Sequence, residues 1–288
     1  MKEKEISDDE IQILGSAYKT PETTGSARKK RRWAAGFVIA ITIIVACITF
    51  IMHYHQYRPP ANETNPVAIQ LEFQPEETIT AGYIEVCDET VNDIPLRIYT
   101  PINAFPELSL SLPDETDSTI VFITPAADIR ADNNNILGDF VLKGERLARG
   151  ISKKGFCSII NQTLTIGMNT ETPLLQDAIR EKGYFFRQYP LVHNSQAIYN
   201  QPKGKSIRRA LAIRNDEIIM IESLERESFH DFAQALADAG IAEAVYLRGG
   251  TDIYGWYREQ QGKQTFFGTK KENFLKGENF IVWKSSKK

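Results

Sequence analysis

The feature that most constrains this chain is an apolar stretch at residues 34–52 that holds no charge and no proline. As a helix, nineteen such residues would rise roughly 28 Å, enough to cross the hydrocarbon core of a membrane. Five consecutive basic residues, 28–32, lie directly before the stretch, and a single arginine, Arg58, lies soon after it. The positive-inside rule therefore predicts that the N-terminus is cytoplasmic and that the chain after residue 53 is exported.

This stretch is predicted to be an uncleaved signal anchor. A cleaved signal peptide has a shorter apolar region, a short basic start and a small-x-small exit, whereas this one follows a long polar tail. The expected organisation is a disordered cytoplasmic tail at 1–33, a transmembrane helix at 34–52, a spacer at 53–66 and one exported domain at 67–288. The protein would then be single-pass, with its C-terminal domain extracytoplasmic, and periplasmic in a Gram-negative bacterium.

Composition narrows the function of the exported part. The chain is 42% apolar and 25% charged, which is ordinary for a globular protein, and its formal net charge of −3 gives no case for nucleic acid as a partner. Cys87 and Cys157 would lie in an oxidising compartment, but their spacing does not require a disulfide, and two buried thiols are favoured. No Cys/His spacing resembles a zinc site, so neither a metal nor a cofactor is expected.

Short apolar or alternating segments rich in β-branched and aromatic residues predict strands at 67–73, 82–86, 95–99, 118–124, 156–160 and 279–283. Hairpins are expected around the turn triplets 143–145 and 214–216. Helical spacing predicts one helix over 173–182, with Gly183 as its C-cap, and a second that starts at Ser228. Many strands with two or three helices predict an α+β fold with mixed or antiparallel sheets.

The second helix is followed by the apolar run 241–247, then by Arg248 and the pair Gly249-Gly250. A short apolar run that stops at paired glycines predicts a buried strand ending in a tight loop. Glycines at such a place let a ligand approach the backbone closely. A simple turn after a core strand fits the pattern equally well.

Four segments in order carry a family resemblance. They are the loop from Thr124 to Asp128, the segment Gln188-Tyr189-Pro190-Leu191-Val192, the strand entry at Arg208, and Leu247-Arg248-Gly249-Gly250. Together they make residues 120–257 resemble the phosphodiester glycosidase family, whose matching motif is Leu-Asp-Gly-Gly. The glycines are retained here, but the acid has become Arg248.

The resemblance implies cleavage of a sugar 1-phosphodiester, with Arg208 as the first phosphate-binding candidate, because a planar guanidinium matches phosphate oxygens in pairs. It implies further ligand contacts from Gln188, Arg248 and the amides of Gly249 and Gly250.

Glycoside cleavage also needs carboxylates, and Asp128 and Asp252 are the catalytic candidates, although aspartates at such places more often cap turns than catalyse. Arg248 beside a carboxylate would make that carboxylate a poorer acid. The aromatic residues in 253–257 could stack on a sugar ring or belong to the core.

Two functions therefore stay open. One is a membrane-anchored phosphodiester glycosidase acting on cell-envelope glycans. The other is a catalytically impaired relative that binds phosphosugars or scaffolds an envelope complex with protein partners. A pure interaction domain that inherits only the fold is a third alternative.

Overall fold

The computed structural model describes residues 66–71, 81–151, 153–270 and 275–285. The expected cytoplasmic tail at 1–33, the transmembrane helix at 34–52 and the spacer up to residue 65 lie outside these ranges. Within them, no helix combines the length and the apolar character that crossing a membrane requires.

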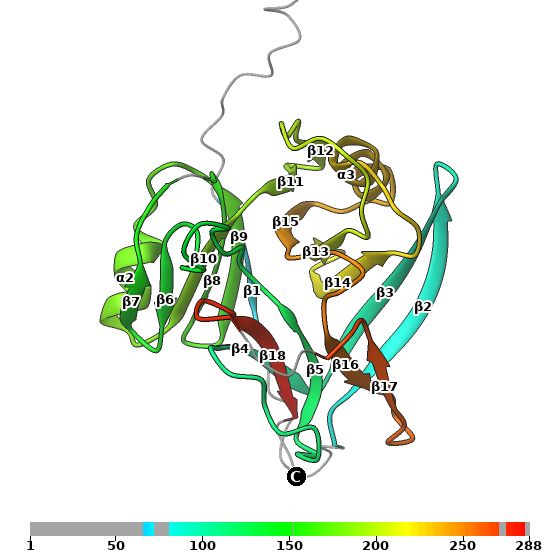
Figure 1. Ribbon diagram of the computed structural model, residues 1–288, viewed down its shortest axis with the longest axis horizontal. Helices are drawn as coiled ribbons and strands as arrows, with labels where there is room; N and C mark the ends of the chain where they lie inside the picture. Colours follow the sequence, from blue (N-terminus) through cyan, green and yellow to red (C-terminus); the bar gives the residue numbers. More distant parts are fainter. Residues whose placement is uncertain (1–65, 72–80, 152, 271–274, 286–288) are drawn as a thin grey trace, which may run out of the picture. The chain divides into compact units, whose positions relative to one another are not determined.

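The described residues form three antiparallel sheets (Figure 1). A six-stranded sheet has the order β1 (Val67–Gln70), β9 (Thr163–Met168), β8 (Gly155–Ile160), β10 (Tyr184–Gln188), β6 (Phe140–Leu142) and β7 (Glu145–Ala148). A seven-stranded sheet has the order β12 (Gln196–Ala197), β11 (Pro190–His193), β15 (Glu243–Leu247), β13 (Arg209–Arg214), β14 (Glu217–Ser223), β3 (Ile94–Ile102) and β2 (Tyr83–Val91). A five-stranded sheet has the order β17 (Gln264–Phe267), β16 (Gly255–Arg258), β5 (Ile120–Pro125), β18 (Phe280–Ser285) and β4 (Ala104–Ser109).

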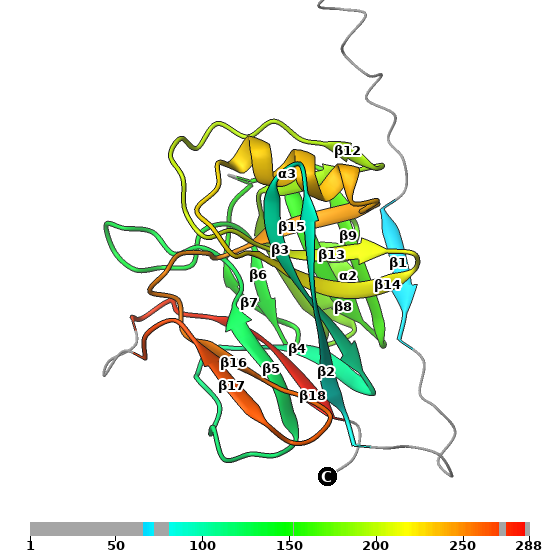
Figure 2. The ribbon, with the colours of Figure 1, turned by 90° about the vertical axis from the view of Figure 1, so that its right-hand side faces the viewer.

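Two helices cover the outer faces of the two larger sheets. Helix α2 (Leu174–Arg180) packs its Leu175 and Ala178 against Phe185 of the six-stranded sheet (Figure 1). Helix α3 (Phe229–Asp238) packs an apolar stripe against the seven-stranded sheet (Figure 2). The predicted α+β class, with antiparallel sheets and two helices, is therefore confirmed for the described residues.

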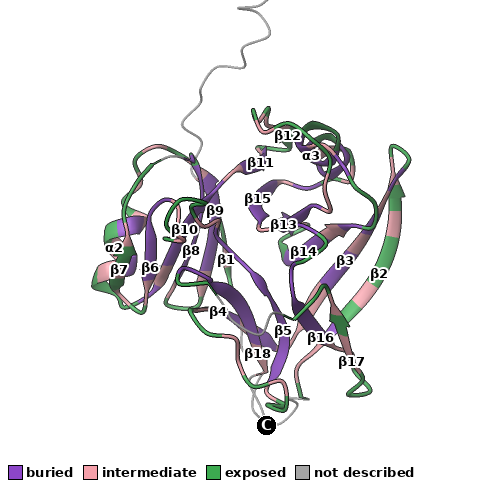
Figure 3. Cartoon of the chain, in the orientation of Figure 1, coloured by how far each residue is buried: buried purple, intermediate pink, exposed green. Residues whose placement is uncertain are grey.

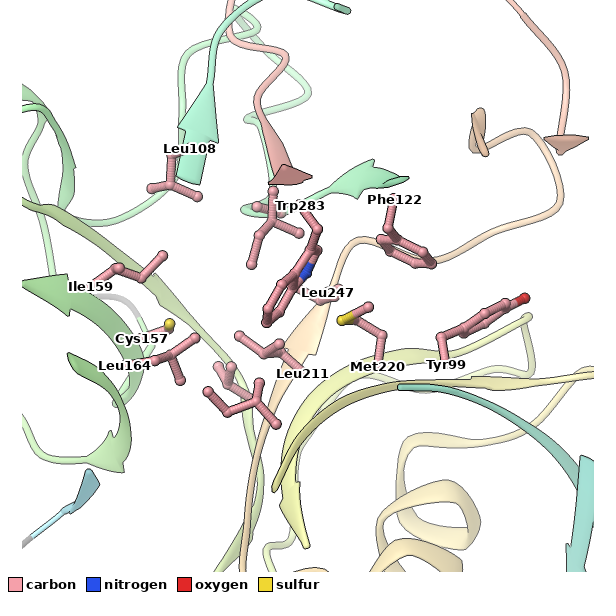
Figure 4. Packing of buried hydrophobic residues seen from close by; sticks show 14 of the residues in the cluster. Tyr99, Leu108, Phe122, Cys157, Ile159, Leu164, Leu211, Met220, Leu247 and Trp283 are labelled. Atoms are coloured by element: carbon pink, nitrogen blue, oxygen red, sulfur yellow. The ribbon is translucent and has the colours of Figure 1, made fainter. Parts of the chain in front are cut away.

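The inner faces of all three sheets share one core. Strand alternation sends neighbouring side chains to opposite faces, so Phe185 meets α2 while Phe186 enters the common core. Figure 4 shows Trp283 of the five-stranded sheet lying among Leu211, Met220 and Leu247 of the seven-stranded sheet. The strands that face this core are buried, while the edge strands β2 and β7 are largely exposed or half-buried (Figure 3).

Several local predictions need correction. Gly183 is not the left-handed residue at the end of α2; Lys182 takes that conformation, with φ +56°. Gly183 is required instead because a Cβ there would lie 2.6 Å from the carbonyl oxygen of Ile159. Both described cysteines are free, and Cys157 is buried but Cys87 is exposed, so the expectation of two buried thiols holds for one of them.

Candidate functional site

The paired glycines after β15 form a corner that is packed by the chain itself. A Cβ at Gly249 would collide with the carbonyl oxygen of Ile207, and Gly250 has φ +127°, a conformation that side chains rarely adopt. The Gly249 amide donates to the Tyr246 hydroxyl (3.0 Å) and the Gly250 amide to the Ile207 carbonyl (3.0 Å). Arg209 reaches the Gly250 carbonyl at 3.2 Å. The amides expected to bind an anion therefore have acceptors inside the protein.

Arg248 and Asp252 lie together on one side of this corner. The Arg248 guanidinium is 3.7 Å from the carboxylate of buried Glu278, and its side chain is 19% exposed. Arg248 and Asp252 line a hollow of about 10 Å³ together with Glu278 and Tyr254. A hollow of that size holds at most one water molecule. The Arg248 guanidinium is thus engaged with Glu278.

The loop that carries Asp128 is held by the start of β18. Asn279 is buried, and its side-chain amide accepts from the Ala127 N–H (2.7 Å) and donates to the Ala127 carbonyl (3.1 Å). On the other side, the Arg248 N–H donates to the Ala126 carbonyl at 3.0 Å. This two-sided clamp fixes the backbone immediately before Asp128.

Asp128 and Gln188 meet through a buried lysine that the sequence analysis did not single out. The Lys153 ammonium pairs with the Asp128 carboxylate and donates to Gln188 Oε1 at 2.7 Å. It also lies 4.3 Å from the centre of the Tyr189 ring. Lys153 is 2% exposed at its side chain, whereas Asp128 is 27% exposed. Asp128 is therefore the member of this cluster that faces solvent.

Two properties mark the cluster as more than packing. Burial lowers the pKa of the Lys153 ammonium, while the neighbouring Asp128 opposes the shift. The amide nitrogen of Gln188 is buried and has no hydrogen-bond partner. Because its oxygen already accepts from Lys153 and from the Tyr189 N–H, the nitrogen is a donor kept out of water. Buried lysines with shifted pKa values and unsatisfied donors are concentrated at functional sites.

Arg208 lies beside an aromatic group next to this cluster. Its guanidinium stacks on the Phe229 ring at 4.1 Å and donates to the carbonyls of Glu227 (2.8 Å) and Gly204 (2.7 Å). Arg208 counteracts the rise in the pKa of Tyr246 that burial causes, and Asp128 reinforces that rise. The charges of Arg208 and Asp128 therefore both act on the Tyr246 hydroxyl. Arg208 and the cluster thus lie within electrostatic range of the same residue.

Of the residues predicted from sequence, the structure brings Asp128, Gln188 and Arg208 into one neighbourhood. It places the side chains of Arg248 and Asp252 around Glu278, and it gives Gly249 and Gly250 a conformational role. The aromatic residues Tyr254, Trp256 and Tyr257 are buried in the core. Lys153 belongs to no recognisable motif, and the only local signal was its position two residues before the buried strand β8.

The larger hollows lie away from this cluster. One, of about 500 Å³, is lined by residues 110–116 and Lys270, and another, of about 470 Å³, lies between β4 and the turns at 161–162 and 181–183. Among the described residues, no three His, Cys, Asp or Glu side chains gather as a metal site would require.

Comparison with known proteins gives a likeness of fold. No protein-family model matches the chain, and no curated protein matches it. The catalytic domain of zebrafish N-acetylglucosamine-1-phosphodiester alpha-N-acetylglucosaminidase, solved in a form auto-inhibited by its pro-peptide, superposes with a TM-score of 0.54 at 10% identity. That match covers 81% of this chain and 92% of the zebrafish domain. A hypothetical protein from Synechocystis has a TM-score of 0.45 at 13% identity, over 70% of this chain and 62% of its own. The chain thus has a phosphodiester glycosidase-like fold, at a distant structural relationship.

Proposed function

We propose that this protein binds and hydrolyses sugar 1-phosphodiesters of cell-envelope glycans at the cluster of Asp128, Lys153 and Gln188. In this proposal Asp128 is the catalytic carboxylate, which activates the water that attacks the anomeric carbon. Lys153 holds Asp128 in place, and Gln188 fixes the Lys153 ammonium by accepting from it. Arg208 fixes the neighbouring aromatic group and adds positive charge beside the phosphate.

The observation that carries the proposal is the buried Lys153 between Asp128 and Gln188. Burying an ammonium group costs free energy, and a protein keeps such a group where it serves an electrostatic purpose. The distant likeness to the zebrafish phosphodiester glycosidase domain supports the class of reaction, and the resemblance of the segments at 124–128, 188–192 and 208–213 supports the location.

The proposal is tested with the full-length protein in detergent and the methyl phosphodiester of N-acetylglucosamine 1-phosphate. Release of free sugar by the wild type is expected, with a loss of about 10²-fold or more in Asp128→Asn, the usual contribution of an acid–base group. Asp132→Asn is the matched control, because Asp132 is an exposed acid on the same loop, paired with Arg130. Equal activity in wild type and Asp128→Asn contradicts the proposal.

A second function is favoured by one observation, the pairing of Arg248 with Glu278. This pair occupies the place where the family resemblance puts an acid. The second candidate is therefore a phosphosugar-binding or scaffolding module of an envelope complex without turnover. Binding of the diester by the wild type without hydrolysis, together with hydrolysis in Arg248→Asp, would favour this second function over the first.

The proposal includes the placement of the site outside the cytoplasm. It is supported by the uncharged stretch at 34–52 and the basic residues before it. Protease added to spheroplasts, in which the inner membrane is intact and its outer side is accessible, should degrade the domain at 67–288 and leave the tail at 1–33 protected. A protected C-terminal domain would contradict this topology.

A further inference from the structure

The loop between β12 and β13, residues 198–208, borders the proposed site and is anchored at both ends. Near its start, the Asn200 side-chain amide donates to the Pro190 carbonyl at 2.7 Å, two residues after the glutamine of the cluster. At its end, the Arg208 guanidinium donates to the Gly204 carbonyl, also at 2.7 Å. Figure 2 shows this β12–β13 loop and the loop after β5, which carries the proposed catalytic carboxylate, projecting from the same side of the molecule.

A line of direct contacts connects the catalytic carboxylate to this loop. Lys153, which pairs with Asp128, lies 4.3 Å from the centre of the Tyr189 ring. The Tyr189 and Phe229 rings meet edge to face, with 5.2 Å between their centroids. The guanidinium of Arg208, which holds the loop, lies 4.1 Å from the centre of the Phe229 ring. The site therefore has an order, with the carboxylate at one end, the rings and the guanidinium next, and the β12–β13 loop at the far end.

Two lysines flank the carbonyl that Arg208 holds. Lys203 is exposed and has no acidic partner among the residues that the structure describes. Lys205 is 64% exposed at its side chain, and its ammonium lies 3.6 Å from the Glu227 carboxylate. The backbone after Lys205 is also fixed, because Ser206 and Glu227 exchange two N–H···O=C hydrogen bonds of 3.0 and 2.8 Å. The two lysines thus extend into solvent from an anchored segment.

The loop end of the site carries an excess of positive charge. The basic side chains Lys203, Lys205 and Arg208 stand against the single acid Glu227, and the exposed acid and base at 225–226 offset each other. A lysine ammonium is a flexible point charge that binds phosphate without one fixed geometry. Lysines at this end of the site are therefore suited to an anionic part of a ligand that extends beyond the arginine.

Resting on the proposed function, we propose that the β12–β13 loop binds a second anionic group on the aglycone, the part of the substrate on the far side of the scissile phosphate. The order of groups in the site sets the order of the ligand. The sugar lies beside Asp128, the scissile phosphate near Arg208, and the aglycone at Lys203 and Lys205. The substrate class is thus a sugar 1-phosphodiester whose aglycone carries a further phosphate, such as the next unit of a polymer joined by phosphodiesters.

The test compares two diesters of N-acetylglucosamine 1-phosphate with the full-length protein, the methyl diester and the 2-phosphoethyl diester. The wild type should cleave the phosphorylated diester with a kcat/KM about tenfold higher, the size that two exposed charge contacts provide. In 1 M salt this preference should largely disappear, because the screening length falls to about 3 Å.

Variants of the two lysines assign the preference to the loop. In the double variant Lys203→Ala/Lys205→Ala the ratio of the two kcat/KM values should fall about tenfold, to near one. The double variant Lys203→Arg/Lys205→Arg retains both charges and should retain the preference. Lys263→Ala is the matched control, because Lys263 is 70% exposed and lies 3.3 Å from Glu259, but belongs to the turn between β16 and β17. It should keep the wild-type ratio.

The contrary results separate the inference from the proposed function. Equal kcat/KM values for the two diesters in the wild type, or a preference that survives the double alanine variant, would overturn the inference and leave the proposed hydrolysis standing. If neither diester is cleaved, the proposed hydrolysis fails, and the same ratio is read from the two binding affinities by calorimetry. A preference in binding that the double alanine variant loses would then support the loop as the anion site. Equal affinities, or no binding of either diester, would overturn the inference as well.

Discussion

At the scale of single residues, the diglycine corner shows how a short motif can serve the backbone instead of a ligand. Gly249 is needed because the Ile207 carbonyl occupies the space of a side chain, and the amides of both glycines are used internally. The motif that first suggested a ligand loop therefore fixes the end of β15 against the entry to β13. The proposed site is instead the cluster of Asp128, Lys153 and Gln188.

Gly249→Ala should destabilise the protein by about 3 kcal/mol, the upper end of the cost of overpacking, because the Ile207 backbone cannot move without disturbing β13. Gly262→Ala is the control, since Gly262 has φ +76° and open space around it. It should cost about 1 kcal/mol for its backbone conformation alone. Urea unfolding measures both values. Equal costs would show that the corner is not tightly packed.

Glu243 predicts a pH-dependent stability. Burial raises its pKa, although the Asn194 amide and His193 at 2.9 Å act against the shift. A raised pKa means that the folded state prefers the protonated form, so the stability this group contributes is present at low pH and lost as pH rises through the raised value. Glu243→Gln stays neutral and should gain stability relative to wild type between pH 4 and pH 7.

The gain should be at most about 1.4 kcal/mol per pH unit. Glu225→Gln, at an exposed position, is the control and should show a flat difference. The measurement is the free energy of urea unfolding at a series of pH values. A difference for Glu243→Gln that falls with rising pH would contradict the assignment.

At the scale of secondary-structure elements, the end of α2 offers a paired prediction. The Gly183 N–H donates to the Ala178 carbonyl at 2.8 Å, and Lys182 before it is left-handed, as in a Schellman motif. Lys182→Gly should therefore stabilise the protein by up to about 1 kcal/mol. Gly183→Ala should destabilise it by about 2 kcal/mol, because the new Cβ meets the Ile159 carbonyl. Thermal unfolding that showed the reverse order would refute this account.

Local sequence signals predicted the elements whose ends are marked by turn-forming or helix-capping residues. The hairpin from β13 to β14 was predicted because Asn215 and Asp216 accept positive φ, with values of +52° and +61°. Helix α3 was predicted because Ser228 can cap it, and its hydroxyl accepts from the Asp231 N–H at 3.0 Å.

Strands without such signals escaped prediction. Strand β4 is separated from β3 by Asn103 alone and contains Pro106, and β10 and β11 are separated by Tyr189 alone, so neither pair has a turn cluster between its members. Strands β16 and β17 have only four residues each. Their pairing with distant partners, such as β16 with β5, depends on tertiary contacts that no local pattern contains.

The candidate site shows the same difference between what local sequence signals predict and what depends on tertiary contacts. Asp128 and Gln188 were predicted from a family resemblance, but the contact between them depends on Lys153 from a third segment. Asn279, which clamps the Asp128 loop, lies 152 residues from Ala127. Contacts between side chains that meet only after three sheets have packed cannot be predicted from local sequence patterns.

At the scale of the whole molecule, the shared core of the three sheets predicts one cooperative unit over residues 64–288. Tryptophan fluorescence reports on Trp256 and Trp283 of the five-stranded sheet, and far-ultraviolet circular dichroism reports on every sheet. In a Trp33→Phe background the two unfolding curves in urea should coincide. Separate midpoints would mean that the sheets unfold independently.

The site is likewise a property of the whole domain. Asp128 follows β5 of the five-stranded sheet, Lys153 precedes β8 and Gln188 ends β10 of the six-stranded sheet, and Tyr246 belongs to β15 of the seven-stranded sheet. The cluster therefore forms where the three sheets meet. A ligand bound there should tighten segments that are remote in sequence.

Hydrogen–deuterium exchange with and without the methyl phosphodiester of N-acetylglucosamine 1-phosphate tests this location most directly. Protection is predicted in the peptides that contain Asp128, Lys153 and Gln188, and no change is predicted around the turns at 161–162 and 181–183. Protection confined to those turns, or no protection at a saturating concentration of the diester, would contradict the assignment of the site.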